Sequence, residues 1–237
     1  MTLHGKTVLI AGGAGEVGEG LVRAFLTEGA TVVVPSRSEE KLDALRELLT
    51  DHDSLITRTA DVGTGNGAAL LRDWIAEEVG PIDAVVASLG GWWQGRPLTD
   101  VSLDTWHEVL DMGLTTHFNV AKTFIPELVG RPGASYTFIN GAAGLSPIPG
   151  AGPLSVSSAG QFMLKDVMAA ENETVRINTL ALATPVRTRS RPDGEETWLT
   201  AADAGAYAVY LASDAAEGTR GETIVLESRD QIQKAMA

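Results

Sequence analysis

Short apolar segments rich in β-branched residues alternate with helical segments along the chain, and this alternation restricts the fold more than any other feature. Most apolar segments are continuous runs, as expected for parallel strands that helices cover on both faces. The expected strands are residues 6–11, 30–35, 55–60, 84–87, 135–140, 175–181 and 222–227. The expected helices are residues 17–28, 39–49, 68–79, 103–128, 157–170 and 201–212. This order predicts one doubly wound parallel sheet in a three-layer α/β/α arrangement.

Composition indicates one domain, residues 1–237, and excludes several classes of partner. No linker rich in Pro, Gly and Ser divides the chain. With 18 basic and 31 acidic residues the net charge is −13, which argues against a nucleic acid or an anionic membrane as partner. The absence of cysteine excludes disulfides and thiolate sites, and no residue spacing suggests a metal site. No targeting segment or membrane-spanning stretch is recognised, so we expect a cytoplasmic protein.

A glycine-rich turn follows the first expected strand and opens the first expected helix. Gly12, Gly15 and Gly18 allow a tight turn and close packing of helix on strand. Glu16 and Val17 begin the helix, whose N-terminus would hold the pyrophosphate of a dinucleotide. The alternative is a structural turn without a ligand. In the first βα unit of an alternating chain, the motif favours a Rossmann-type dinucleotide-binding fold.

The end of the second expected strand indicates which dinucleotide binds. A fold that selects NAD(H) places an acidic residue here to bind the ribose 2′-hydroxyl. This chain has Ser36 and Arg37 instead, which suit a 2′-phosphate because the guanidinium pairs with it. The alternative is a solvated arginine at a helix start. The sequence therefore predicts NADP(H) as cofactor in preference to NAD(H).

At several motifs the chain resembles the short-chain dehydrogenase/reductase family over nearly its whole length. Arg176-Ile177-Asn178 and the run from Tyr210 to Asp214 are similar to the family's sixth strand and closing segment. The glycine turn departs from the family's compact members, which have a glycine where this chain has Glu16. The resemblance implies that further residues contact the cofactor. These are Asp61, Val62, Ala87, Ser88 and Gly90.

The resemblance also locates the family's catalytic tetrad, Asn, Ser, Tyr and Lys. Gly113, Gly141, Leu154 and Ser158 stand at those four positions, with the spacings of 28, 13 and 4 residues kept. A tyrosine with an unperturbed pKa of about 10 needs a nearby cation before it can move a proton near neutral pH. The sequence therefore predicts an atypical member that keeps the scaffold and lacks the proton relay.

Three residues are candidates for replacement functions. His117 lies four residues after Gly113 and would share its helix face; the alternative is packing at a dimer interface. Trp92 and Trp93 would stand beside the cofactor cleft and stack on an apolar or aromatic ligand. For these two, the alternative is a core or oligomer contact.

Three functions follow from these residues. The first is an atypical NADP(H)-dependent oxidoreductase acting on a small carbonyl or hydroxyl compound by a mechanism other than the family's. The second is a catalytically inactive dinucleotide-binding protein. The third is a lyase, isomerase or cyclase that reuses the substrate cleft. The resemblance implies a homo-tetramer or homo-dimer, paired through residues 103–128 and 157–170, with residues 222–227 at a second interface.

Overall fold

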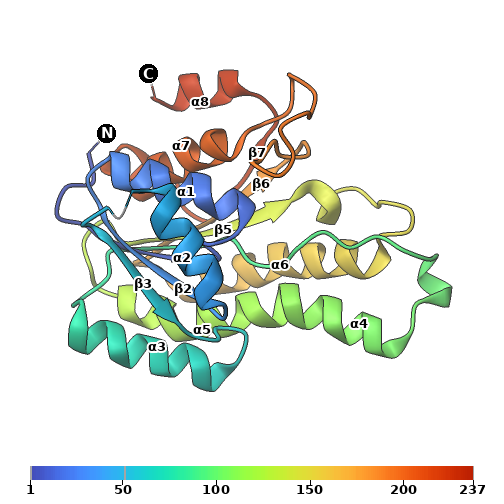
Figure 1. Ribbon diagram of the computed structural model, residues 1–237, viewed down its shortest axis with the longest axis horizontal. Coiled ribbons are helices and arrows are strands. Elements are labelled where there is room, and N and C mark those ends of the chain that lie inside the picture. Colours follow the sequence, from blue (N-terminus) through green and yellow to red (C-terminus); the bar gives the residue numbers. More distant parts are fainter. Residues whose placement is uncertain (1, 51, 237) are drawn as a thin grey trace.

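The computed structural model describes residues 2–50 and 52–236, and the strands in these residues form one parallel sheet (Figure 1). The strand order is β3-β2-β1-β4-β5-β6-β7. The strands are β1 Thr7–Ala11, β2 Thr31–Ser36, β3 Leu55–Thr59, β4 Ala84–Ala87, β5 Ser135–Gly141, β6 Arg176–Leu182 and β7 Thr223–Leu226. All seven predicted strands are present within two residues at each end. The doubly wound parallel sheet is confirmed.

Two layers of helices cover the two faces of the sheet (Figure 1). One core cluster joins the sheet to α1, α2, α7 and α8, and the other joins it to α3, α5 and α6. The helices are α1 Glu16–Thr27, α2 Glu39–Leu48, α3 Gly65–Glu78, α4 Leu103–Leu110, α5 Thr116–Leu128, α6 Gly152–Glu171, α7 Ala201–Ala212 and α8 Arg229–Met236. The three-layer α/β/α arrangement of a single domain is therefore confirmed.

Alternating side chains of β1 show how one apolar run serves both layers. Val8 and Ile10 point into the cluster with α1 and α7, whereas Leu9 and Ala11 point into the cluster with α5. None of the four is more than 1% exposed. Burying a side chain the size of Val, Leu or Ile contributes roughly 1.5–3 kcal/mol, so a strand buried on both faces has no polar alternation.

The helix predicted over residues 103–128 is interrupted in its middle. A π-helical turn, Asp111–Thr115, separates α4 from α5. The side chain of Ser157 enters beside this turn, where its Oγ accepts a hydrogen bond from the Leu114 backbone N–H (3.1 Å). A side chain that inserts into the backbone ladder is a usual cause of such an irregularity. The turn places Gly113 against α6.

The ends of the last helices also differ from the prediction. Helix α6 begins at Gly152, five residues before the predicted start, because Pro153 is tolerated in the first turn of a helix. Helix α8 was not predicted. Its mean hydropathy is low, and Ile232 is its buried residue. Gln231 Oε1 accepts hydrogen bonds from the backbone N–H groups of Glu227 (2.6 Å) and Ser228 (3.1 Å), which supports its first turn.

The strand order reverses between β1 and β4. The chain runs from β1 to β3 toward one edge of the sheet and from β4 to β7 toward the other. Ala11 and Ala87, the last residues of β1 and β4, are paired in register. Ligands of such sheets bind outside the carboxyl ends of the strands at this reversal. A ligand site is therefore expected at the segments that follow Ala11 and Ala87.

Candidate functional site

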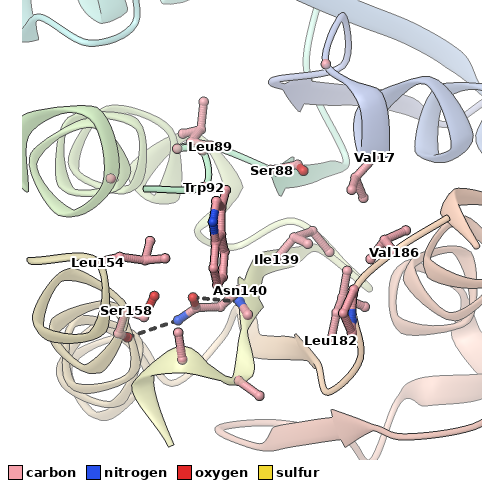
Figure 2. Close-up of a pocket in the computed structure, with 18 of the residues that line it drawn as sticks. Val17, Ser88, Leu89, Trp92, Ile139, Asn140, Leu154, Ser158, Leu182 and Val186 are labelled. Atoms are coloured by element: carbon pink, nitrogen blue, oxygen red, sulfur yellow. Dashed lines mark hydrogen bonds between the residues drawn. The ribbon is translucent and has the colours of Figure 1, made fainter. Parts of the chain in front are cut away.

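A cavity of about 780 Å³ lies at the carboxyl ends of β1, β4, β5 and β6. Its walls come from the turn before α1, the segment after β4, the π turn, the first turns of α6 and the segment after β6. Figure 2 shows side chains from these elements converging from opposite sides. Most are apolar. This volume is typical of a pocket for a small molecule or cofactor.

The glycine turn forms one end of the cavity and is packed tightly against β4. Gly12 has φ +86°, and a Cβ at this position would lie 2.0 Å from the Ser88 carbonyl oxygen. A Cβ on Gly18 would lie 2.1 Å from the Gly12 carbonyl oxygen. Gly15 is the N-cap of α1 and supplies no side-chain hydrogen bond to the first turn. The first-turn N–H groups are therefore available to a phosphate, so the turn fits a dinucleotide.

Glu16, the first residue of α1, lines the same end of the cavity. Its carboxylate accepts hydrogen bonds from Thr188 Oγ1 (2.7 Å) and from the Ser190 hydroxyl. These bonds, Ser190 first and Thr188 second, hold the pKa of Glu16 below its ordinary value, and Arg191 and Arg189 act in the same direction. Sequence reasoning missed this arrangement, since the partners lie more than 170 residues away along the chain.

The residues predicted for the adenosine half of a dinucleotide lie outside the cavity. Ser36 ends β2, and its Oγ accepts a hydrogen bond from the Ser38 backbone N–H (3.2 Å), while Arg37 is exposed. Asp61 follows β3 and accepts from the Gly63 N–H (3.0 Å). Val62 beside it is buried. All four stand at the carboxyl ends of β2 and β3, where the sequence placed them.

The segment after β4 contributes Ser88, Gly90 and Trp92 to the cavity. Trp92 projects toward Asn140 in Figure 2, and 62% of it is exposed. Two predictions need correction. Ala87 is fully buried in the sheet and does not reach the cavity. Trp93 does not line it either, because its ring packs within its own segment, where a Cβ on Gly95 would lie 3.0 Å from Trp93 Cζ2.

The four positions of the family tetrad meet in the cavity. Gly113 from the π turn, Gly141 from the end of β5, and Leu154 and Ser158 from α6 all line it. A Cβ on Gly113 would lie 2.4 Å from Ser157 Oγ, whereas a Cβ on Gly141 would meet nothing within 4 Å. The scaffold therefore brings the positions together, and their side chains supply no acid or base.

Asn140 is a polar cavity residue that sequence reasoning missed. Its Nδ2 donates to the Ser158 carbonyl oxygen (3.0 Å), and its Oδ1 accepts from the Gly141 N–H (2.8 Å) (Figure 2). Asn140 thereby fixes α6 to the end of β5. The available signal was a polar residue near the end of a buried strand, directly before a tetrad position. Beneath it, Gln161 Nε2 donates to Ser157 Oγ (3.4 Å), so hydroxyl and amide groups form the polar floor.

Ionisable side chains are nearly absent from the cavity. Among the described residues that line it, Glu16 and Arg191 are the ionisable ones, and they stand at the end with the glycine turn. At the tetrad end, Asn140, Ser146, Ser157, Ser158 and Gln161 can form hydrogen bonds. None of these residue types titrates near neutral pH. The arrangement can bind and polarise a ligand, but it offers no side chain that exchanges a proton.

The prediction that His117 reaches the cleft is wrong. His117 is 0% exposed, does not line the cavity and stacks on Phe138 with ring centroids 5.5 Å apart. Burial lowers its pKa to about 4, with a smaller opposing effect from the Leu89 backbone. It is a neutral core residue at neutral pH. The four-residue spacing from Gly113 did not put both on one face because the π turn intervenes.

Lys165 is likewise remote from the cavity. Its ammonium group is buried and donates to the Gly221 carbonyl oxygen (2.6 Å) and to Asp166 (2.5 Å). In the described part of the chain, no group of three or more His, Cys, Asp or Glu side chains is placed to hold a metal ion. No helix among those residues is long and apolar enough to cross a membrane.

Comparisons with known proteins identify relatives of this chain. The sequence profile of the short chain dehydrogenase family matches residues 6–196. The chain is 24% identical over 250 residues to an uncharacterized oxidoreductase of Bacillus subtilis, YvrD, covering 93% of this chain and 94% of that protein.

Solved structures share the fold. A short-chain type dehydrogenase/reductase from Mycobacterium ulcerans superposes with a TM-score of 0.88 at 22% identity, covering 98% of this chain and 92% of that one. A gluconate 5-dehydrogenase from Burkholderia cenocepacia, in complex with NADP and tartrate, superposes with a TM-score of 0.85 at 24% identity, covering 95% of each chain.

Proposed function

This chain belongs to the short chain dehydrogenase family, and from that premise we propose that it is an NADP(H)-dependent oxidoreductase. Its substrate is a small, largely apolar carbonyl or hydroxyl compound, and its mechanism is not the family's. One observation carries the proposal. A single cavity of about 780 Å³ runs from the glycine turn to the four tetrad positions, so one space serves the reactive end of a dinucleotide and a small molecule beside it.

Several groups support the choice of cofactor. The uncapped first turn of α1 suits a pyrophosphate. Ser36 and the exposed Arg37 stand at the end of β2, where a 2′-phosphate would bind. NADP is the cofactor bound to the Burkholderia cenocepacia gluconate 5-dehydrogenase. When bound, the nicotinamide supplies the hydride transfer, so the protein needs to orient the substrate and exclude competing reactions.

The residues of the cavity suggest how the substrate is held. Trp92, Met112 and Leu154 offer an apolar surface to it. The amide of Asn140, already fixed by bonds to Ser158 and Gly141, keeps a second N–H for a substrate oxygen. Because no ionisable side chain lines this end, the proton that balances a transferred hydride comes from water.

The missing acid or base also favours a second candidate function. A protein that binds the dinucleotide without turning over a substrate needs the glycine turn and not a proton relay. The discriminating experiment incubates the protein with NADPH and a panel of ketones, aldehydes and quinones, and with NADP⁺ and the matching alcohols. Oxidation or reduction of the nicotinamide above the protein-free rate supports the oxidoreductase. Tight binding without turnover of any panel member supports the binding protein.

We expect NADPH to bind more tightly than NADH, and Arg37→Ala to remove the difference. The lost charge-assisted hydrogen bond to the 2′-phosphate should weaken NADPH binding by about 1–3 kcal/mol, while NADH binding stays unchanged. Fluorescence titration of both nucleotides measures this. Arg58→Ala is the matched control. Arg58 lies near the carboxyl end of β3, the strand beside β2, and its guanidinium is held over the Trp74 ring. Equal affinity of the native protein for both nucleotides would refute the prediction.

We also propose a homo-oligomer, dimeric or tetrameric, that pairs through α4, α5 and α6. Leu103, Phe118 and Met163 each expose a large apolar side chain, one on each of these helices, and a second copy would bury them. The edge strand β7 would form the second interface. Light scattering should give a mass of at least twice 24.9 kDa.

A charge placed on the interface should reduce that mass. Met163→Glu should do so, whereas Leu70→Glu, on an equally exposed residue of α3, should not. A native mass of 24.9 kDa at micromolar concentration would contradict the proposal.

A further inference from the structure

The segment after β6 is tied onto the first turns of α1. Thr188 and Ser190 both donate to the Glu16 carboxylate, as described above. One turn further along α1, Glu19 accepts hydrogen bonds from Arg189 Nη2 (2.8 Å) and Nε (3.3 Å). We call these five residues the loop latch. The contacts join parts of the chain about 170 residues apart, so they fix the position of the segment over the helix.

The latched segment is ordered by its own backbone. Arg187 N–H donates to the Leu199 carbonyl (2.8 Å), and Ala201 N–H donates back to the Arg187 carbonyl (3.2 Å). Arg191 N–H donates to the Thr188 carbonyl (3.1 Å). The latch supports this arrangement from α1, so opening of the latch would let these backbone bonds open more often and let residues 187–191 move away from the helix.

The latch puts an anion inside the cavity. Glu16, Thr188 and Arg191 line the cavity together with Gly12 and Gly15. The carboxylate stays ionised at neutral pH, since its hydrogen bonds lower its pKa. It also stands at the positive end of the α1 dipole, which stabilises a negative charge. The pyrophosphate of a dinucleotide binds at this end of such a helix. The Glu16 carboxylate and the pyrophosphate would therefore both occupy the positive N-terminal end of α1.

We propose that Glu16 is an internal competitor of the cofactor's pyrophosphate, which sets the affinity for the dinucleotide and links its binding to release of the 187–191 segment. This inference rests on the proposed binding of NADP(H). Thr188 and Ser190 each have one hydroxyl proton, so neither can donate it to Glu16 and to a phosphate together. Cofactor binding therefore breaks the latch, and the 187–191 segment, which lines the cavity through Thr188 and Arg191, moves when the dinucleotide arrives.

Two variants of Glu16 test the inference with two measurements. Glu16→Gln removes the charge and keeps an acceptor, whereas Glu16→Ala removes both. Without nucleotide, hydrogen exchange of the Arg187 and Arg191 amides should be about tenfold faster in Glu16→Ala, because the segment is released. In titrations, NADPH should bind about tenfold more tightly to both variants, because repulsion between the carboxylate and the pyrophosphate is removed.

Two further variants serve as controls. Glu77→Gln, on the exposed face of α3, removes one charge far from the cavity and should change neither measurement. Glu19→Gln frees Arg189 but leaves the Glu16 carboxylate in place. It should speed the exchange and change NADPH affinity less than threefold. Comparison of Glu19→Gln with Glu16→Ala therefore separates the effect of the Glu16 charge from that of a looser segment.

Every outcome decides between the two proposals. If native protein and Glu16 variants bind NADPH equally, the inference is overturned and the proposed cofactor stands. If Glu16→Ala and Glu16→Gln bind and the native chain does not, the inference stands and the native protein is not NADP(H)-dependent. If no variant binds a dinucleotide, both are overturned. Unchanged exchange of residues 187–191 in Glu16→Ala overturns the latch even where affinity changes.

Discussion

A chain with the family tetrad restored should reduce a small ketone with NADPH at least about a hundredfold faster than the native chain. The changes are Gly113→Asn, Gly141→Ser, Leu154→Tyr and Ser158→Lys. All four positions line one cavity, so the new side chains would face the same ligand. A tyrosine hydroxyl at position 154 would donate the proton, and a lysine at position 158 would lower its pKa from about 10.

The structure shows that the four changes need a fifth. A Cβ on Gly113 would lie 2.4 Å from Ser157 Oγ and 3.2 Å from Gln161 Nε2. Ser157→Ala removes the closer atom, although it leaves the Leu114 N–H without its acceptor at a cost of about 1–3 kcal/mol. We expect the quintuple variant, which includes Ser157→Ala, to fold. The quadruple variant without that change should be less stable. Gly141→Ser meets nothing within 4 Å of its Cβ and needs no compensation.

The matched control is the quintuple variant with Leu154→Phe in place of Leu154→Tyr. It keeps the ring and the lysine but has no hydroxyl to donate, so ketone reduction should return to the native rate. Initial rates of NADPH consumption at saturating ketone are compared for the native chain, the quintuple variant and the Leu154→Phe control. The interpretation would be wrong if the native chain already reduced such ketones rapidly and the restored tetrad abolished turnover. The present residues would then belong to a working mechanism of their own.

The fold was predictable because its signals are local. Continuous apolar runs such as that of β1 indicate burial on both faces, and Ser38 indicates the start of α2, where its Oγ accepts from the Lys41 N–H. Gly29 and Gly80, both with positive φ, directly follow the C-cap residues of α1 and α3, so a glycine after a helical pattern is a local stop signal. The π turn was not predictable in this way, because its cause is Ser157, 43 residues away along the chain from Leu114.

The candidate site shows the same division. Motif spacing located Gly12, Gly141 and Leu154 in one cavity, because the fold fixes which strand ends meet. Spacing did not reveal what Glu16 contacts or that His117 is buried on Phe138. Both depend on packing between segments far apart in the sequence. A residue type in a motif therefore predicts position well, while its partners and its charge state follow from the tertiary contacts.

Gly12→Ala should destabilise the protein by about 3–5 kcal/mol and abolish dinucleotide binding. Two effects add at this position. The φ of +86° is unfavourable for any residue with a Cβ. The added Cβ would also lie 2.0 Å from the Ser88 carbonyl oxygen, a backbone atom that cannot rotate away. Ser88 N–H is bonded to the Ala11 carbonyl (2.8 Å), so relief of the overlap must separate the ends of β1 and β4.

Gly141→Ala is the control for this change. Gly141 ends β5, the strand on the other side of β4, and lines the same cavity, but it has φ −99° and open space around a Cβ. We expect its stability to stay within about 0.5 kcal/mol of native. Urea unfolding at one protomer concentration compares the three chains, because the stability of an oligomer depends on concentration. Equal losses at both glycines would mean that the tight contact between Gly12 and Ser88 does not hold the two strand ends together.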